Sequence, residues 1–244
     1  MKTLISAYHT TRFWVVITLL SLVLGTAAVT ARLFDPTGNT SHKISALWAR
    51  LLCVWNGVQV EVEGLEHAHS DRAQVFLANH QSFFDIFALA GFLPVQLRWV
   101  AKASLFRIPF VGWSMHASGY ISVQRDDRKN AYQAFMASVE KLKSGASIVI
   151  FPEGTRSKDG NIGEFKKGGT LLASRAGVPI VPVTLIGTGG IIPKGSTAVH
   201  PGKVRIILSP EIDLETAKNQ KESELLQKIR ETICQNFESK QISK

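Results

Sequence analysis

An uncharged run near the N-terminus limits what the first thirty residues can form. Between Arg12 and Arg32 lie 19 residues without a charge, from Phe13 to Ala31. As an α-helix this run would be about 29 Å long, close to the thickness of the hydrocarbon core of a bilayer. It therefore predicts a membrane-associated helix. A cleaved signal peptide and a buried core helix are the alternatives, because basic residues precede the run and small residues end it.

A second apolar stretch, residues 44–58, follows the first. It is interrupted by Arg50 and contains Trp48 and Trp55. Tryptophan is typical of the membrane–water boundary, so the stretch predicts an interfacial helix, with an amphipathic core helix as the alternative. We therefore expect residues 1–57 to form N-terminal membrane-anchoring helices. The basic residues around them are too evenly divided to predict an orientation.

From residue 58 onward the patterns are typical of an α/β domain. Residues 58–63 alternate between apolar and polar side chains, which predicts a half-exposed strand. Further apolar runs lie at 75–78, 99–101, 120–123, 147–151, 180–185 and 204–208, and helical patterns lie at 83–90, 128–143, 169–176 and 215–237. Strands alternating with helices predict an α/β fold, here a mixed central sheet flanked by helices. Residues 58–244 are therefore expected to form one domain behind the membrane-associated helical segment.

The composition excludes several classes of protein and indicates an anionic partner. Charged residues make up only 19% of the chain and hydrophobic residues 45%, which excludes an intrinsically disordered protein. Cys53 and Cys234 are too few and too far apart for a disulfide framework or a cysteine-based metal knuckle. The net charge is +9, and residues 98–175 carry most of the excess, with 13 basic against 6 acidic side chains. This region predicts binding to nucleic acid, lipid headgroups or a phosphorylated substrate.

The first polar cluster, residues 79–85, directly follows the apolar run 75–78. If Ser82 is the N-cap of the next helix, Asp85 occupies the third helical position and points back toward the turn that contains His80. A carboxylate there could accept from one imidazole nitrogen and leave the other free as a base. The alternative is that Asp85 only caps the helix.

The second polar cluster, residues 151–157, follows another apolar run. Gly154 provides a flexible turn, and Thr155, Arg156 and Ser157 bring together two hydroxyls and a guanidinium, donors that suit a phosphate monoester. A polar turn with a solvated arginine is the alternative.

The remaining motifs carry less information. A third polar cluster, residues 119–125, ends in Arg125, for which surface placement is the simplest interpretation. Residues 187–190 lack the third glycine of a dinucleotide-binding fingerprint and the helix that should follow it. The histidines do not form a zinc-ligand pattern, so we expect no metal site.

Taken together, the clusters resemble the signature blocks of a known family. Asn79-His80-x4-Asp85, residues 119–125, residues 151–157 and residues 178–183 stand in the order and approximate spacing of the four blocks of the glycerolipid acyltransferases. The resemblance covers roughly residues 58–210, and within the family the lysophosphatidate acyltransferases are the most similar.

The resemblance implies an activity and a set of roles. A fatty acyl group would pass from an acyl-carrier-protein or coenzyme A thioester to the sn-2 hydroxyl of lysophosphatidate. His80 would act as general base and Asp85 would orient it. The acceptor site would contain Lys102, Arg125, Glu153, Gly154, Thr155 and Arg156. The family needs neither a metal nor a cofactor, because the thioester is a co-substrate.

The expected partners are the lipid bilayer, the lysophospholipid acceptor and the thioester donor, and nucleic acid is not among them. We expect the protein at the inner (cytoplasmic) membrane, with the catalytic domain on the cytoplasmic side. Ser122, Val123 and Gln124 precede Arg125, where many relatives carry an aromatic and then a polar residue. This departure leaves another lysophospholipid or a lyso-aminolipid as the alternative acceptor. A non-enzymatic basic membrane module is the alternative of a different class.

Overall fold

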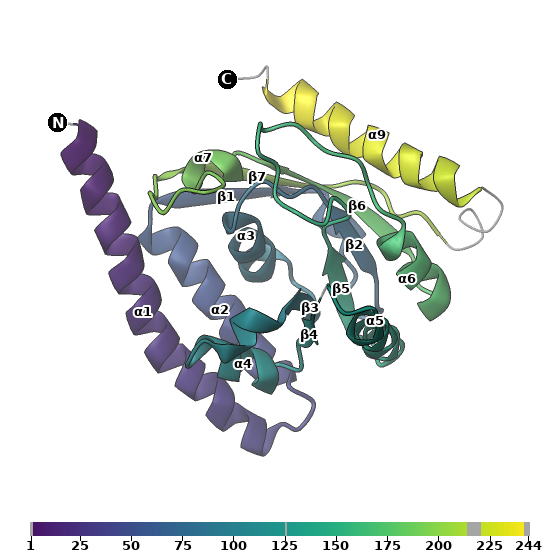
Figure 1. Ribbon diagram of the computed structural model, residues 1–244, viewed down its shortest axis with the longest axis horizontal. Helices are drawn as coiled ribbons and strands as arrows, with labels where there is room; N and C mark the ends of the chain where they lie inside the picture. The colour runs from purple at the N-terminus through teal and green to yellow at the C-terminus, as the bar shows by residue number, and fades with distance from the viewer. Residues whose placement is uncertain (1, 125, 214–220, 242–244) are drawn as a thin grey trace.

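The centre of the fold is a mixed seven-stranded sheet. In this computed structural model, which describes residues 2–124, 126–213 and 221–241, the strands lie in the order β1-β7-β6-β2-β5-β3-β4 (Figure 1). Their bounds are β1 Val58–Glu63, β2 Val75–Ala78, β3 Leu97–Lys102, β4 Ile121–Val123, β5 Ser147–Ile150, β6 Ile180–Ile186 and β7 Gly202–Leu208. Neighbouring strands are parallel except β6 and β7, which are antiparallel. The predicted α/β fold with a mixed central sheet is confirmed.

Helices cover both faces of this sheet. Their bounds are α1 Lys2–Phe34, α2 Asn39–Trp55, α3 Phe84–Phe92, α4 Val111–Ala117, α5 Arg128–Lys143, α6 Gly168–Ala176, α7 Thr188–Ile191 and α9 Glu222–Gln241, with 3-10 turns η1 Leu65–His67 and η2 Ala103–Arg107. In Figure 1, α1, α2 and α3 lie on one side of the sheet, and α5, α6 and α9 on the other. The helix predicted at 215–237 corresponds to α9, although its first residues fall within 214–220 and so lie outside the described residues.

The central strand β2 separates two hydrophobic cores. All of its residues are buried. Phe76 and Ala78 belong to the core shared with α2 and α3, and Val75 and Leu77 to the core shared with α5, α6 and α9. Successive side chains of a strand point to opposite faces, so a strand covered on both sides is apolar at every position. The end of β2 is therefore held firmly from both sides.

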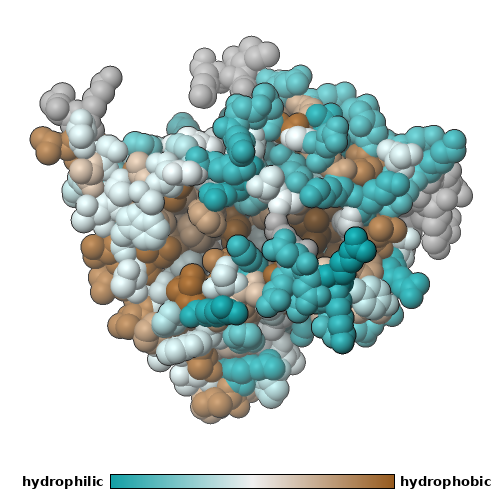
Figure 2. Space-filling model, viewed as in Figure 1, coloured by the Kyte–Doolittle hydropathy of each residue, from teal (hydrophilic) through white to brown (hydrophobic). Residues whose placement is uncertain are grey.

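Helix α1 packs against the rest of the protein along one face and exposes most of its apolar side chains. Phe13 is 2% exposed, and its ring centroid lies 5.8 Å from that of Phe84. Within the described residues α1 is the one helix that is long and apolar enough to cross a membrane, and 28% of its most apolar window is buried. Brown side chains gather along the left-hand edge of Figure 2, where α1 runs. The exposed ones are Leu4, Ile5, Tyr8, Trp14, Val15, Leu19, Leu22, Val23, Val29, Leu33 and Phe34.

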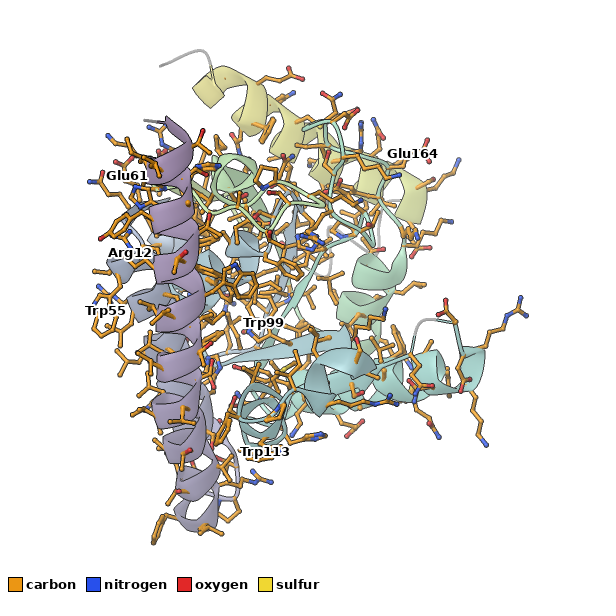
Figure 3. The ribbon with its side chains drawn as sticks, turned by 60° about the vertical axis from the view of Figure 1, so that its left-hand side comes forward. Arg12, Trp55, Glu61, Trp99, Trp113 and Glu164 are labelled. Carbon is orange, nitrogen blue, oxygen red and sulfur yellow. The ribbon has the colours of Figure 1, made fainter. Side chains whose placement is uncertain are left out.

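Helix α2 combines features of the interfacial helix that the sequence predicts and of its alternative, an amphipathic core helix. Ala49 and Cys53 are fully buried against the sheet, whereas Trp55 is 52% exposed. Figure 3 shows Trp55 at the edge of the molecule beside α1 and Trp113 of α4 toward the lower end, with Trp99 in the interior. One face of α2 thus belongs to the core, and the other continues the apolar surface of α1.

The predicted boundary between residues 1–57 and 58–244 falls in the turn between α2 and β1. Side chains from α1 and α2 nevertheless share one hydrophobic core with the sheet. The two N-terminal helices are therefore part of the packed structure as well as carriers of the apolar surface.

Candidate active site

Asn79 fixes the chain where β2 ends. It is fully buried, its Nδ2 donates to the carbonyl oxygen of Leu185 at 2.9 Å, and the backbone N–H of Leu185 donates to its Oδ1 at 2.7 Å. Both bonds reach the neighbouring strand β6. Because His80 follows directly, the sheet sets the position of its backbone.

His80 and Asp85 form the pair that the sequence predicts. The Nδ1 of His80 lies 2.7 Å from Oδ2 of Asp85, whose side chain is fully buried. The same oxygen accepts from the backbone N–H groups of Gln81 at 2.7 Å and Ser82 at 2.8 Å. A carboxylate oxygen cannot donate, so Nδ1 carries the hydrogen of the neutral ring and Nε2 is the basic nitrogen. No hydrogen bond within the described part of the chain occupies Nε2.

The predicted start of the next helix is wrong by one residue. Helix α3 begins at Phe84 with Phe83 at the cap position, and Ser82 lies one residue before the cap. The hydroxyl of Ser82 accepts from the N–H of Phe84 at 3.3 Å and donates to the carbonyl oxygen of Ile192 at 2.8 Å. Asp85 still accepts from the N–H of Ser82, as in a capping box, so its predicted direction back toward His80 holds.

Phe151, which ends the run before the second polar cluster, supports the imidazole from one face. The two ring centroids are 4.0 Å apart and the rings are tilted by only 13°. The side chain of His80 is 15% exposed, so the ring is mostly enclosed but still reaches the surface. Stacking and the bond to Asp85 together hold the ring in one orientation.

Glu153 contacts the loop of His80 through the backbone. Its Oε1 accepts from the N–H of His80 at 2.7 Å, and its Oε2 accepts from the N–H of Gly163 at 3.0 Å. Burial raises the pKa of Glu153, and the two N–H groups act in the opposite direction. The N–H of Ser157 completes the connection by donating to the carbonyl oxygen of His80 at 2.7 Å. Both carboxylate oxygens are thus used to hold loops, and a contact of Glu153 with the acceptor stays a prediction.

The turn after Glu153 presents the predicted phosphate donors. Gly154 has a φ of 73°, a conformation that favours glycine. Thr155 is exposed, and the guanidinium carbon of Arg156 lies 4.0 Å from the ring centroid of Phe83. The two predicted clusters therefore meet in space, and the Arg156 side chain lies over the residue that precedes α3.

Two predicted site residues are not connected to this group by the structure. Lys102 ends β3, and its exposed side chain makes no hydrogen bond to any described residue. Arg125 lies outside the described residues. Across the described ranges, no group of three or more His, Cys, Asp or Glu side chains could hold a metal ion.

Sequence reasoning missed two supporting aromatic residues, Phe83 and Phe151, and one cation. Lys194 donates from Nζ to Thr155 Oγ1 at 3.2 Å and also to the carbonyl oxygen of Arg156. The aromatic residues lie inside the predicted clusters, each two residues before a carboxylate, Asp85 or Glu153, and this spacing is a usable signal. Lys194 lies far along the chain, and its only signal is that it is the single basic residue in 176–202.

A mixed α/β sheet with a histidine–carboxylate pair at a strand end and an arginine turn beside it matches one family of enzymes. The family model described as Acyltransferase matches residues 59–186, slightly more than half of the chain. The chain belongs to this family, and the resemblance predicted from the four blocks is confirmed.

Individual relatives make the comparison more specific. The chain is 41% identical over 183 residues to the chloroplastic 1-acyl-sn-glycerol-3-phosphate acyltransferase LPAT1 of Arabidopsis thaliana, covering 74% of this chain and 51% of that protein. It is 32% identical over 217 residues to the 1-acyl-sn-glycerol-3-phosphate acyltransferase of Pseudomonas aeruginosa, covering 86% and 83%. The chain spans about half the length of the chloroplastic relatives it matches.

A solved structure has the same fold over nearly the whole chain. The 1-acyl-sn-glycerophosphate (LPA) acyltransferase PlsC from Thermotoga maritima superposes with a TM-score of 0.85 at 30% identity. The match covers 99% of this chain and 98% of that one, so it includes α1 and α2 as well as the sheet.

Proposed function

We propose that this protein is a 1-acyl-sn-glycerol-3-phosphate acyltransferase, which moves a fatty acyl group from a thioester to the sn-2 hydroxyl of lysophosphatidate and so forms phosphatidate. The observation that carries the proposal is the 2.7 Å contact between His80 Nδ1 and Asp85 Oδ2, which leaves Nε2 free as a base beside the Arg156 turn. The relatives from Arabidopsis and Pseudomonas bear this name, which supports the choice of acceptor.

The reaction follows from general-base catalysis by His80. Nε2 takes the proton of the acceptor hydroxyl while its oxygen attacks the thioester carbonyl carbon. The tetrahedral intermediate then collapses, the carbon–sulfur bond breaks, and the departing thiolate receives the proton from the imidazolium. Asp85 stays ionised throughout and stabilises the imidazolium. A positioned base of this kind contributes about 10²–10⁴-fold in rate, and no covalent enzyme intermediate is needed.

The acceptor phosphate is proposed to bind at residues 154–156. Arg156 offers a planar fork for two phosphate oxygens, and Thr155 offers a hydroxyl. Lys102 and Arg125 are proposed to add positive charge near the phosphate. Glu153 is proposed to act indirectly, because its Oε1 accepts from the backbone N–H of His80 and so holds the loop that carries the base.

The donor is proposed to be an acyl-carrier-protein or coenzyme A thioester, with no metal or cofactor in the reaction. We place the protein at the inner (cytoplasmic) membrane with its catalytic domain on the cytoplasmic side. The exposed apolar side chains of α1 and α2 support membrane association, because single-sided apolar surface of this extent is costly in water.

Acyl transfer by the purified protein tests the proposal. Wild-type protein in detergent micelles is incubated with radiolabelled lysophosphatidate and an acyl-coenzyme A or acyl-carrier-protein donor, beside a panel of other lysophospholipids and a lyso-aminolipid. Labelled phosphatidate is expected from wild type and not from His80→Ala. Preference for another acceptor would replace lysophosphatidate, and turnover that persists in His80→Ala would exclude His80 as the base.

A further inference from the structure

Lys194 belongs to a short segment that contacts both loops of the candidate site. Its Nζ donates to Thr155 Oγ1 at 3.2 Å and to the backbone carbonyl oxygen of Arg156. Two residues earlier, the carbonyl oxygen of Ile192 accepts from the hydroxyl of Ser82 at 2.8 Å, in the loop of His80. The segment that follows α7 thus connects the base-bearing loop to the arginine turn.

Three cations lie at or beside this turn. Besides Arg156 and Lys194, the Nζ of Lys166 lies 3.1 Å from the point where a Cβ on Gly154 would be. Among the described residues, none of these three cations forms an ion pair with a carboxylate. Neighbouring cations repel each other unless an anion lies between them, so this turn is suited to an anionic group of the acceptor.

The contact with Thr155 also has a direction. An ammonium group has no acceptor, so the hydroxyl oxygen of Thr155 must accept from Lys194. The single hydroxyl hydrogen of Thr155 is then free to donate elsewhere, and the exposed position of Thr155 leaves it accessible from the site. A hydroxyl that accepts from a cation becomes a stronger donor, because the bonds in such a chain polarise one another.

We propose that Lys194 is a positioning residue for the acceptor phosphate: it fixes the Thr155 hydroxyl as a donor to a phosphate oxygen and adds a positive charge beside Arg156. This inference rests on the proposed acyl transfer to lysophosphatidate. It assigns to the segment after α7 a part in acceptor recognition that lies outside the four sequence blocks.

Steady-state kinetics of Lys194→Met test the inference, with Lys158→Met as the matched control. Lys158 is exposed in the same loop as Arg156, and its side chain makes no hydrogen bond to any other residue the structure describes. Lys194→Met is expected to raise KM for lysophosphatidate about tenfold, the size of a charge-assisted hydrogen bond, with kcat within about threefold of wild type. Lys194→Arg keeps a charged donor and is expected to stay near wild type, as is Lys158→Met.

A second variant separates phosphate recognition from simple loop support. Thr155→Val removes the hydroxyl and is expected to raise KM as Lys194→Met does. The double variant should raise KM by less than the product of the two single effects, because both remove the same Thr155 contact. Loss of a structural tether would instead lower kcat, because the same loop holds His80 through Glu153 and Ser157. A kcat loss at constant KM, a wild-type KM in Lys194→Met, or multiplied effects in the double variant would overturn the inference.

Folding and the proposed function are checked separately. Melting temperatures from circular dichroism identify variants that fail to fold. If Lys194→Met fails to fold, the test uses the other two variants: Thr155→Val must raise KM for lysophosphatidate, and Lys194→Arg must keep the wild-type KM. A wild-type KM in Thr155→Val overturns the inference. If wild type itself transfers no acyl group to lysophosphatidate, the proposed function fails, and this outcome is seen before any variant is compared.

Discussion

Oδ2 of Asp85 lies 2.7 Å from Nδ1 of His80 and accepts two backbone N–H groups of the same loop. One carboxylate oxygen therefore selects the imidazole tautomer and also fixes the backbone that carries the imidazole. The buried position of Asp85 strengthens these bonds, because little water competes for the carboxylate.

Asp85→Asn is expected to lower kcat by about 10²–10⁴-fold with little change in KM for lysophosphatidate. The amide oxygen can take the place of Oδ2 and accept the same bonds, but the imidazolium loses its negatively charged partner. The NH2 group would then take the place of the buried Oδ1, which has no hydrogen-bond partner among the described residues. Asp71→Asn, at an exposed position, is the matched control and should keep wild-type kcat. Full activity of Asp85→Asn would show that the negative charge of Asp85 is not needed for catalysis by His80.

Glu153→Gln is expected to lower kcat at least tenfold, as the loss of a charge-assisted hydrogen bond to the loop of His80 implies. Each carboxylate oxygen accepts from a backbone N–H, at His80 and at Gly163. Glutamine can satisfy only one of the two, and its NH2 group then meets the other donor. The exposed Glu164→Gln is the control, and kcat with saturating lysophosphatidate is the measurement. A change in KM alone would mean that Glu153 acts on the acceptor and not on His80.

Arg156→Lys is expected to raise KM for lysophosphatidate about tenfold, because lysine keeps the charge but loses the bidentate fork. It also loses the planar contact with the ring of Phe83, 4.0 Å away. Arg175→Lys on the exposed surface of α6 provides the same exchange away from the site. Equal KM values for wild type and Arg156→Lys would argue against a fork-shaped phosphate contact.

Local patterns predicted much of the fold because the relevant interactions are local. Strand β1 lies at 58–63 as predicted, since alternation with a period of two residues specifies a strand covered on one face. Helix α5 lies at 128–143 as predicted, and the side chain of Asp127 caps it by accepting from the N–H groups of Lys129 and Asn130. Such signals involve residues a few positions apart, which the sequence displays directly.

The candidate site could be predicted only where its contacts are also short in sequence. His80 and Asp85 belong to one loop, so their spacing predicted the pair. The contact between Lys194 and Thr155 depends instead on β6 and β5 lying on either side of β2, an order that no local pattern contains. The hydroxyl of Ser82 also donates to the carbonyl oxygen of Ile192, a contact that is distant in sequence and that no local pattern contains.

Phe13→Ala is expected to lower the free energy of unfolding by about 3–5 kcal/mol, the usual cost of removing a buried phenylalanine ring. The ring is 2% exposed and packs against Phe84 and Phe87, which links α1 to the start of α3. Val15→Ala, at a 51% exposed position of α1, should change stability far less. Urea unfolding in detergent micelles measures both. Unchanged stability of Phe13→Ala, together with a mature protein that lacks α1, would favour the signal-peptide alternative.

The buried His42 of α2 links the N-terminal helices to the sheet. The backbone N–H of Leu97 donates to its Nε2 at 3.1 Å, so Nδ1 carries the hydrogen and donates to the hydroxyl of Tyr120 at 2.9 Å. Burial, reinforced by the charge of Arg98, lowers the pKa of His42 to about 4. The neutral ring is therefore required where α2 meets β3 and the segment before β4.

The stability of the protein is expected to fall as the pH decreases from about 6.5 toward 4. In the unfolded chain His42 titrates near 6.5, so below that pH the unfolded state binds a proton that the folded state excludes. The contribution of the neutral His42 to the free energy of unfolding is fully present above about pH 6.5. Below that pH it decreases by about 1.4 kcal/mol per pH unit, down to about pH 4. In urea unfolding at pH 7, 6 and 5, His42→Gln should lose part of the pH dependence, whereas the exposed His116→Gln should keep it. If the free energy of unfolding changes equally with pH in wild type and in His42→Gln, the His42 ring accepts a proton without destabilising the folded protein.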